Sequence, residues 1–97
     1  MNKETAVSEV VHHPERGRFE LLVAGQSCHA DYRLRDGVML LTHTEVPVEL
    51  EGRGLAARVV AAALEYARAQ GLKVNPLCSY VRSYMNRHPQ TLDLLAH

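Results

Sequence analysis

The chain has 97 residues, 46% of them apolar, which predicts a single domain spanning residues 1–97 with a modest core. Its 11 basic and 11 acidic residues cancel, so neither nucleic acid nor an anionic membrane is an expected partner. No apolar run approaches the roughly 18 residues that span a bilayer, and the N-terminal segment lacks the pattern of a secretory signal. Cys28 and Cys78 are not spaced like a disulfide scaffold, which indicates two free thiols and a cytoplasmic protein.

The first half of the chain predicts an antiparallel meander of strands. Alternating or apolar segments are expected to form strands at residues 6–13, 18–25, 28–34 and 38–46. In the second of these, Phe19, Leu21 and Val23 share one face, as a half-buried strand requires. Asp36 and Gly37 predict a hairpin turn, because this pair tolerates positive φ.

The second half predicts two helices with a strand between them. Residues 55–70 contain no glycine or proline and repeat apolar residues at helical spacing, and Gly71 ends this helix. A short strand is expected at 72–77, a second helix at 79–89 and a last turn within 91–97. The order β-β-β-β-α-β-α predicts an α/β (α+β) fold, with a mixed, mainly antiparallel sheet of about five strands and two main helices.

The turn before the first helix has the features of an anion site. Gly52, Arg53 and Gly54 precede the first turn of the helix, where unpaired N–H groups and the helix dipole attract negative charge. Glycines let the backbone approach a phosphate, and Arg53 and Arg58 add positive charge. The P-loop and dinucleotide patterns do not fit, because the turn lacks their lysine, hydroxyl and third glycine. A plain start of a helix with a glycine cap explains the same residues.

Three further residues are candidates for chemistry. Cys78 opens a helix, whose positive end favours a thiolate, although a cysteine that only fills the core fits the same position. Cys28 lies within an alternating strand and is assigned to the core. His43 and Glu45 lie two residues apart on a strand and share a face, either as candidate bases or as solvated side chains. No carboxylate or cysteine stands at tight ligand spacing to a histidine, so no metal site is expected.

The chain resembles the GNAT superfamily of N-acetyltransferases. The segment "VPVELEGRGLA" is similar to the GNAT pyrophosphate loop, Gln/Arg-x-x-Gly-x-Gly/Ala, which falls on Glu51, Gly54 and Ala56 with an acid in the first position. The resemblance is closer to a subgroup of small, single-domain acetyl-CoA-binding proteins with "HTEV", "GRG(I/L)A" and "PLCSYV" segments. These segments fall at residues 43–46, 52–56 and 76–81, and the resemblance covers roughly residues 18–90.

This resemblance implies a site for acetyl-CoA. The strand ending at Val46 would separate from the strand at 72–77, and backbone groups of Glu45, Val46 and Val48 would hold the pantetheine arm. The N–H groups of residues 53–57 would surround the pyrophosphate. The implied residues of the glycine turn and helix are Gly52, Arg53, Gly54, Leu55, Ala56, Ala57 and Arg58.

The resemblance also implies an activity, the transfer of acetyl from acetyl-CoA to an amine. Cys78 would lie near the thioester and accept the acetyl group, and Tyr84 would protonate the leaving thiolate, unless Tyr80 and Tyr84 are only a packing pair. The sequence does not identify the acceptor amine. The insertion between the first strands, at residues 14–18, is short and leaves little for a small-amine pocket, which favours a protein, a peptide or a surface lysine as the acceptor. Two alternatives remain: a module that binds or senses acetyl-CoA without turnover, and a structural domain in which all three motif matches are accidental.

Overall fold

The computed structural model describes residues 9–97, and the start of the first predicted strand, at residues 6–8, lies outside them. The strands are β1 (Val11–His13), β2 (Arg18–Val23), β3 (Gln26–Arg35), β4 (Val38–Glu45) and β5 (Lys73–Pro76). The helices are α1 (Leu55–Ala69) and α2 (Ser79–Arg87). A short 3-10 helix, η1 (Val48–Leu50), precedes α1, and another, η2 (Pro89–Leu94), follows α2. The predicted fold class and the order of the main elements are confirmed, and η1 is an additional element.

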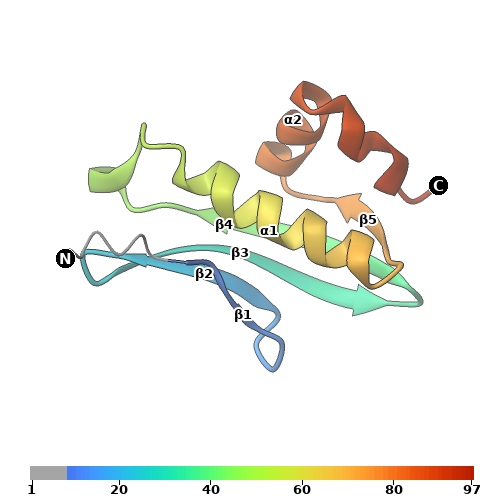
Figure 1. Ribbon diagram of the computed structural model, residues 1–97, viewed down its shortest axis with the longest axis horizontal. Helices are drawn as coiled ribbons and strands as arrows, with labels where there is room; N and C mark the ends of the chain where they lie inside the picture. The colour runs from blue at the N-terminus through green and yellow to red at the C-terminus, as the bar shows by residue number, and fades with distance from the viewer. Residues whose placement is uncertain (1–8) are drawn as a thin grey trace.

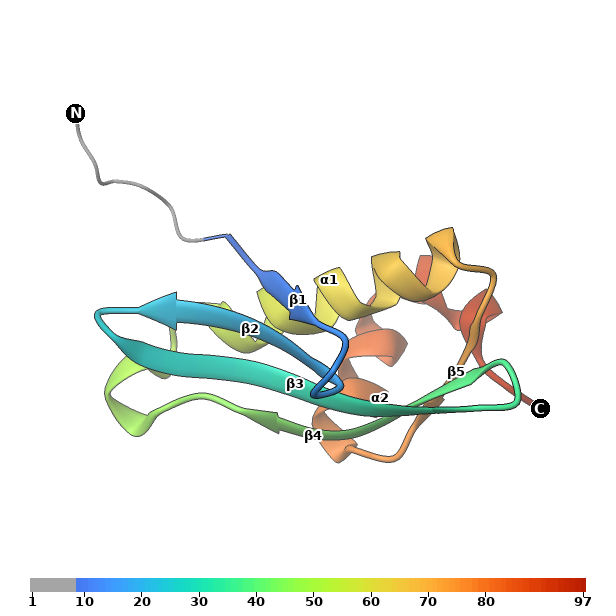
Figure 2. The ribbon, with the colours of Figure 1, turned by 90° about the horizontal axis from the view of Figure 1, so that it is seen from below.

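The strands form one five-stranded sheet in the order β1-β2-β3-β4-β5 (Figure 2). The first four strands pair antiparallel with their neighbours, and β4 and β5 are parallel, with α1 as the connection between them. In the C-terminal segment Leu95 forms a bridge with Val74, and the Ala96 N–H donates to the Val74 carbonyl at 2.9 Å. The end of the chain therefore pairs with the edge strand β5.

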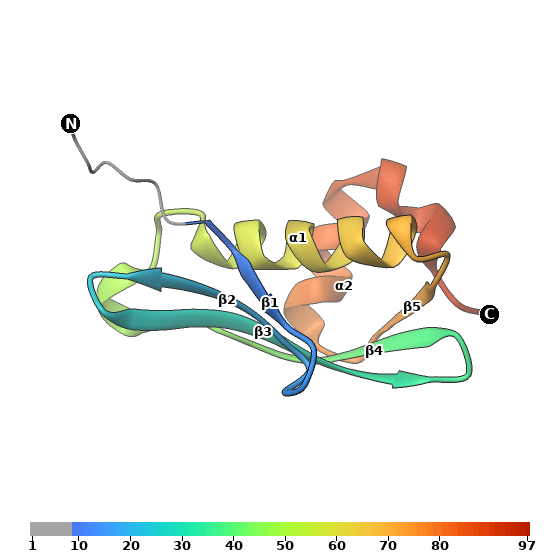
Figure 3. The ribbon, with the colours of Figure 1, turned by 60° about the horizontal axis from the view of Figure 1, so that its bottom comes forward.

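Both main helices lie on the same side of the sheet, which leaves its other face open (Figures 1 and 3). The buried strand side chains that face the helices are Phe19, Leu21, Cys28, Ala30, Tyr32, Met39, Leu41 and Val74. Cys28 is fully buried, as expected for a core residue. Leu34 continues the alternation of β3 but is 55% exposed, because the pairing of β3 with β2 ends at Asp31.

A bulge in β4 changes which residues face the helices. Tyr32 pairs with Leu41 but Asp31 pairs with His43, so Thr42 is an extra residue on β4. Before the bulge the odd-numbered residues of β4, such as Leu41, are buried against the helices. After it, Thr44 takes the covered face opposite the buried Ala30, and His43 and Glu45 project from the open face.

The parallel strands part at the end where α1 begins. Pairing between β4 and β5 runs only from Val38 with Lys73 to Leu41 with Pro76, while β4 continues to Glu45 against β3 alone. This separation is the one that the resemblance implied. Within residues 9–97 no helix combines the length and the apolar character needed to cross a bilayer.

Candidate functional site

A hollow of about 190 Å³ lies where the end of β4, the glycine turn and the first turn of α2 meet. Its wall is mainly apolar and contains small residues that expose backbone. The lining residues are Val46, Leu50, Glu51, Gly52, Gly54, Leu55, Ala56 and Tyr80. Residues from all three segments that carried the sequence resemblance thus contribute to a single concave surface.

The glycine turn has the backbone shape that an anion site requires. Gly52 and Gly54 have φ values of 84° and 75°, and a Cβ atom at either position would meet nothing within 4 Å, so the turn is open on that side. Gly54 caps α1 without a side-chain hydrogen bond, and the regular ladder begins with the Arg58 N–H donating to the Gly54 carbonyl at 3.3 Å. The N–H groups of the first turn are therefore available to an external acceptor at the positive end of the helix dipole.

The predicted residues around this turn differ in exposure. Arg53 and Arg58 are exposed, and Val48 is 78% exposed, so only its backbone suits a role in binding. Leu55 is buried and anchors the first turn of α1 in the core, as Leu50 anchors η1. Ala57 is partly buried against the core. The turn is thus fixed by apolar contacts while its backbone faces outward.

Cys78 lies at the point where the parallel strands part. Its N–H donates to the Leu41 carbonyl at 3.0 Å, and its sulfur lies 3.5 Å from the Thr44 hydroxyl oxygen, where that hydroxyl can donate to the thiolate. Partial burial raises the pKa of the Cys78 thiol, but hydrogen bonds to Thr44 and to the backbone of Val81 and Tyr80 outweigh it and hold the pKa below its ordinary value. The start of α2 therefore favours the thiolate, as predicted from its position.

His43 and Glu45 contact each other on the open face. The distance from His43 Nε2 to Glu45 Oε1 is 3.1 Å, and His29 of β3 approaches the same oxygen at 3.9 Å. The hydrogen bond from His43 is the main cause that holds the pKa of Glu45 below its usual range. The predicted common face of the pair is confirmed, but it is opposite to the face where Thr44 meets Cys78.

Tyr84 lies away from this hollow. Its side chain is only 8% exposed, stacks on His88 with ring centroids 4.0 Å apart, and lines a separate hollow with Leu64 of α1. Burial raises the pKa of Tyr84, which opposes its ionisation. Tyr80, which the sequence offered only as a packing partner, lines the hollow at the glycine turn instead.

The sequence interpretation missed three residues near the two candidate sites. Thr44 and His29 were not singled out, and Tyr80 was given no chemical role. Thr44 and Tyr80 stand within the matched segments at residues 43–46 and 76–81, which was the available signal. His29 joins His43 and Glu45 only through strand pairing, so no local pattern marks it.

The fold and the hollow together define a small α+β domain. In it the parallel strands β4 and β5 separate beside the N-terminus of α1, the helix that connects the two strands. The sequence profile of the GCN5-related N-acetyl-transferase family matches residues 18–94, and the chain belongs to this family.

Relatives and a solved structure agree with this assignment. The chain is 36% identical to Protein NATD1 of Danio rerio over 59 residues, 59% of this chain and 54% of that protein. It is 39% identical to Protein NATD1 of Homo sapiens over 49 residues, 50% of this chain and 43% of that protein. The alignments thus span about half the length of these relatives. The NMR structure of a GCN5-like protein from Staphylococcus aureus has the same fold, with a TM-score of 0.74, 22% identity and coverage of 94% of this chain and 90% of that one.

Proposed function

We propose that this protein binds acetyl-CoA and transfers its acetyl group to an amine, with Cys78 as the intermediate acceptor. One observation carries the proposal: the end of β4, the glycine turn and the start of α2 line a single hollow, through Val46, Gly54 and Tyr80. Membership of an acetyltransferase family makes an acetyl thioester the ligand that such a surface suits best.

The backbone of the turn is proposed to bind the phosphates. The N–H groups of residues 53–57 surround the pyrophosphate, and the exposed side chains of Arg53 and Arg58 add charge around it. The pantetheine arm lies along β4 beyond Leu41, where β5 no longer pairs with it. This path directs the thioester from the turn toward Cys78, whose N–H is bonded to Leu41.

In the first chemical step the Cys78 thiolate attacks the thioester carbonyl. A new bond forms between carbon and the Cys78 sulfur, the bond to coenzyme A breaks, and the coenzyme A thiolate takes up a proton. Tyr80 lines the hollow and is better placed than Tyr84 to supply this proton, because Tyr84 lies in the other hollow. The exchange of one thioester for another is close to neutral in energy.

In the second step the amine attacks the acetyl-cysteine. Its nitrogen forms the amide bond, Cys78 leaves as a thiolate, and the ammonium proton passes to a base. Glu45, with His43 bonded to it, is the proposed base for an amine that arrives from the open face at the end of β4. An open face suits an amine presented by a protein or peptide.

A second function, binding or sensing of acetyl-CoA without turnover, is favoured by a specific observation. Cys78 contacts Thr44 on the covered face, whereas His43 and Glu45 project from the open face. The candidate nucleophile and the candidate base are thus on opposite sides of β4.

Intact-protein mass spectrometry after incubation with acetyl-CoA tests the transfer. We expect a gain of one acetyl group that is absent in Cys78→Ala and present in the control variant Cys28→Ala, because Cys28 is fully buried. A panel of amines and peptides should then discharge the acetyl group. Binding of acetyl-CoA with neither acetyl-Cys78 nor an acetylated amine would overturn the transferase proposal in favour of the binding module.

A further inference from the structure

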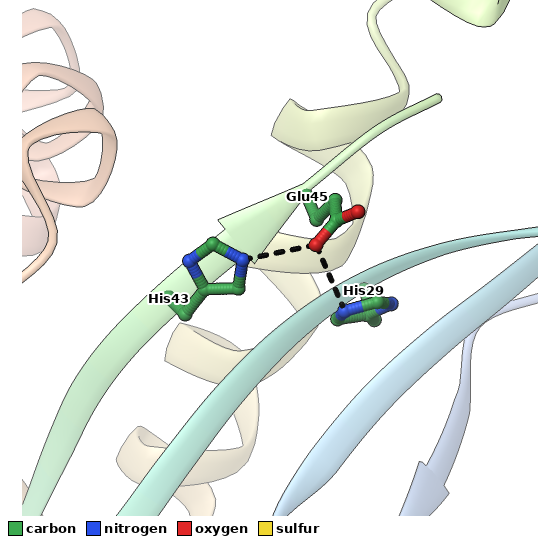
Figure 4. Close-up of side chains that lie close together, drawn as sticks. All are labelled: His29, His43 and Glu45. Carbon is green, nitrogen blue, oxygen red and sulfur yellow. Dashed lines mark hydrogen bonds and ion pairs between the residues drawn. The ribbon is translucent and has the colours of Figure 1, made fainter. Parts of the chain in front are cut away.

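Two histidines and a glutamate form a cluster on the open face of the sheet (Figure 4). His29 comes from β3, and His43 and Glu45 come from β4. One ligand atom from each of the three lies within 4.8 Å of those from the other two. Both rings point toward the Glu45 carboxylate, at 3.1 Å from His43 Nε2 and 3.9 Å from His29 Nε2. We refer to these residues as the His-His-Glu cluster.

A hydrogen-bond chain fixes the orientation of His29. The Ser27 hydroxyl donates to Glu20 Oε2 at 2.6 Å, and the same oxygen lies 3.0 Å from His29 Nδ1. Because the only hydroxyl proton of Ser27 is directed to Glu20, the Ser27 oxygen accepts a hydrogen bond from the Nδ1–H group of the His29 ring. In the neutral ring Nε2 then carries a lone pair, as in metal sites where the outer nitrogen of a ligand histidine donates to a neighbouring group.

The lone pair of His29 faces acceptors. Its Nε2 lies 3.9 Å from Glu45 Oε1 and 4.0 Å from Asp31 Oδ2. A neutral nitrogen and two carboxylates have no proton to share among them, so they do not stabilise one another. A cation between His29 and Glu45 would satisfy both.

Of the three carboxylates around the cluster, Asp31 and Glu20 each pair with an arginine, whereas Glu45 pairs with none in the described part of the chain. Arg18 binds Asp31 through two hydrogen bonds of 2.7 and 3.2 Å, and Arg16 lies 3.5 Å from Glu20. Within residues 9–97 no ion pair joins Glu45 to a lysine or arginine. In this part of the chain the ion-pair partners of the Glu45 carboxylate are therefore histidines.

We propose that the His-His-Glu cluster is a binding site for a divalent transition-metal cation, with Zn²⁺ as the best-suited ion. Two imidazole nitrogens and a carboxylate oxygen are ligands that Zn²⁺ prefers, whereas Mg²⁺ and Ca²⁺ prefer oxygen alone. Zinc bonds of about 2.0–2.1 Å in tetrahedral geometry place ligand atoms about 3.3 Å apart. The His43–Glu45 distance of 3.1 Å already fits, and His29 needs to approach Glu45 by less than an ångström from 3.9 Å.

Access to the cluster is open, and a coordination position remains for water or another ligand. A cation bound here would occupy Glu45, which could then not act as the base in the proposed transfer, so the two roles exclude each other at any one time. The side chains of His43 and Glu45 are 56% and 60% exposed, while His29, at 12%, is fixed in the sheet. The sequence predicted no metal site because these ligands do not stand at ligand spacing along the chain. Strand pairing, which opposes His29 to Glu45, brings the ligands together instead.

The test is a titration of the untagged protein with Co²⁺, followed by visible absorption, and then displacement by Zn²⁺. We expect one equivalent of Co²⁺ to bind, Zn²⁺ to displace it, and Mg²⁺ to leave the spectrum unchanged. Glu45→Gln and His29→Gln should abolish the signal. Ser27→Ala, which removes the orienting hydroxyl, should weaken affinity about 10–100-fold.

His13→Gln is the matched control, because His13 also lies on the open face and bonds to a glutamate, Glu20, at 3.1 Å. It should bind Co²⁺ like the unaltered protein. The Glu45 side chain is exposed, so Glu45→Gln should leave the fold intact. Unchanged Co²⁺ binding in Glu45→Gln would overturn the proposal, as would an equal loss of binding in His13→Gln. The titration contains no acetyl-CoA, so its failure and the failure of the proposed function are distinguishable.

Discussion

The two faces of the sheet carry two different kinds of candidate site at the end of the same strand. On the covered face, Thr44 meets Cys78 near a hollow whose wall is mainly apolar and includes the two glycines of the turn. On the open face, His43 and Glu45 belong to a layer of hydrogen-bonded, ionisable side chains. Neighbouring residues of β4 therefore serve two surfaces.

This difference has a consequence for how each surface tolerates change. A site built from backbone depends on φ angles and on the packing that fixes the turn, so its side chains matter less than its shape. A site built from side chains depends on the identity of each group and on the neighbours that orient it. The bulge at Thr42 connects the two, because it directs Thr44 to one face and Glu45 to the other.

The largest contrast between the faces is expected in stability. Leu21 and Leu22 are neighbours in β2, with exposures of 0% and 53%. Leu21→Ala removes a side chain from the core under the helices and should cost about 2–5 kcal/mol in the free energy of unfolding. Leu22→Ala removes one from the open face and should change it by about 0.5 kcal/mol or less. Urea denaturation measures both, and a loss of similar size in the two variants would show that the open face is covered in solution.

A smaller contrast is expected between the two ends of α1. Gly54 and Gly71 have φ values of 75° and 71°, and a Cβ atom at either position would meet nothing within 4 Å. Gly54→Glu and Gly71→Glu therefore impose similar backbone strain, about 1–2 kcal/mol. Only the charge at Gly54 would repel a pyrophosphate, so this variant should weaken coenzyme A binding by about tenfold or more, or about 1.4 kcal/mol.

Isothermal titration calorimetry with coenzyme A measures this effect, and Gly71→Glu serves as the control for strain and charge. Equal affinities of the two variants for coenzyme A would show that its phosphates do not bind at the glycine turn. The result would then count against a site built from backbone on the covered face.

The sequence was sufficient for the fold, and it indicated where the candidate site on the covered face lies, because both depend on local patterns. Alternation in β2 and β3, the helical spacing of α1 and the glycines before it are each readable within a few residues. The open-face cluster was not readable, since His29 reaches Glu45 through antiparallel pairing. The bulge at Thr42 has no sequence signature, and without it alternation from Leu41 would direct His43 and Glu45 to the covered face.

The smallest expected contrast concerns the two cysteines and Thr44. Burial raises the pKa of Cys28, whereas the pKa of Cys78 is lowered by the hydrogen bonds that outweigh its partial burial. A lowered pKa means that the thiolate of Cys78 forms at lower pH, so its alkylation by iodoacetamide should rise at a lower pH than that of a free cysteine. Cys28 should stay unmodified in the folded protein.

Thr44→Val keeps the shape of the side chain but removes the hydroxyl that bonds to the Cys78 sulfur at 3.5 Å. The pKa of Cys78 should rise, and the pH profile of alkylation should shift to higher pH, with a rate several-fold lower at neutral pH. Thr42→Val is the matched control, because its hydroxyl donates to the Asp31 carbonyl at 3.3 Å instead. If both variants retained the original profile, the thiolate would owe its stability to the start of α2 alone, and Thr44 would have only a packing role on the covered face.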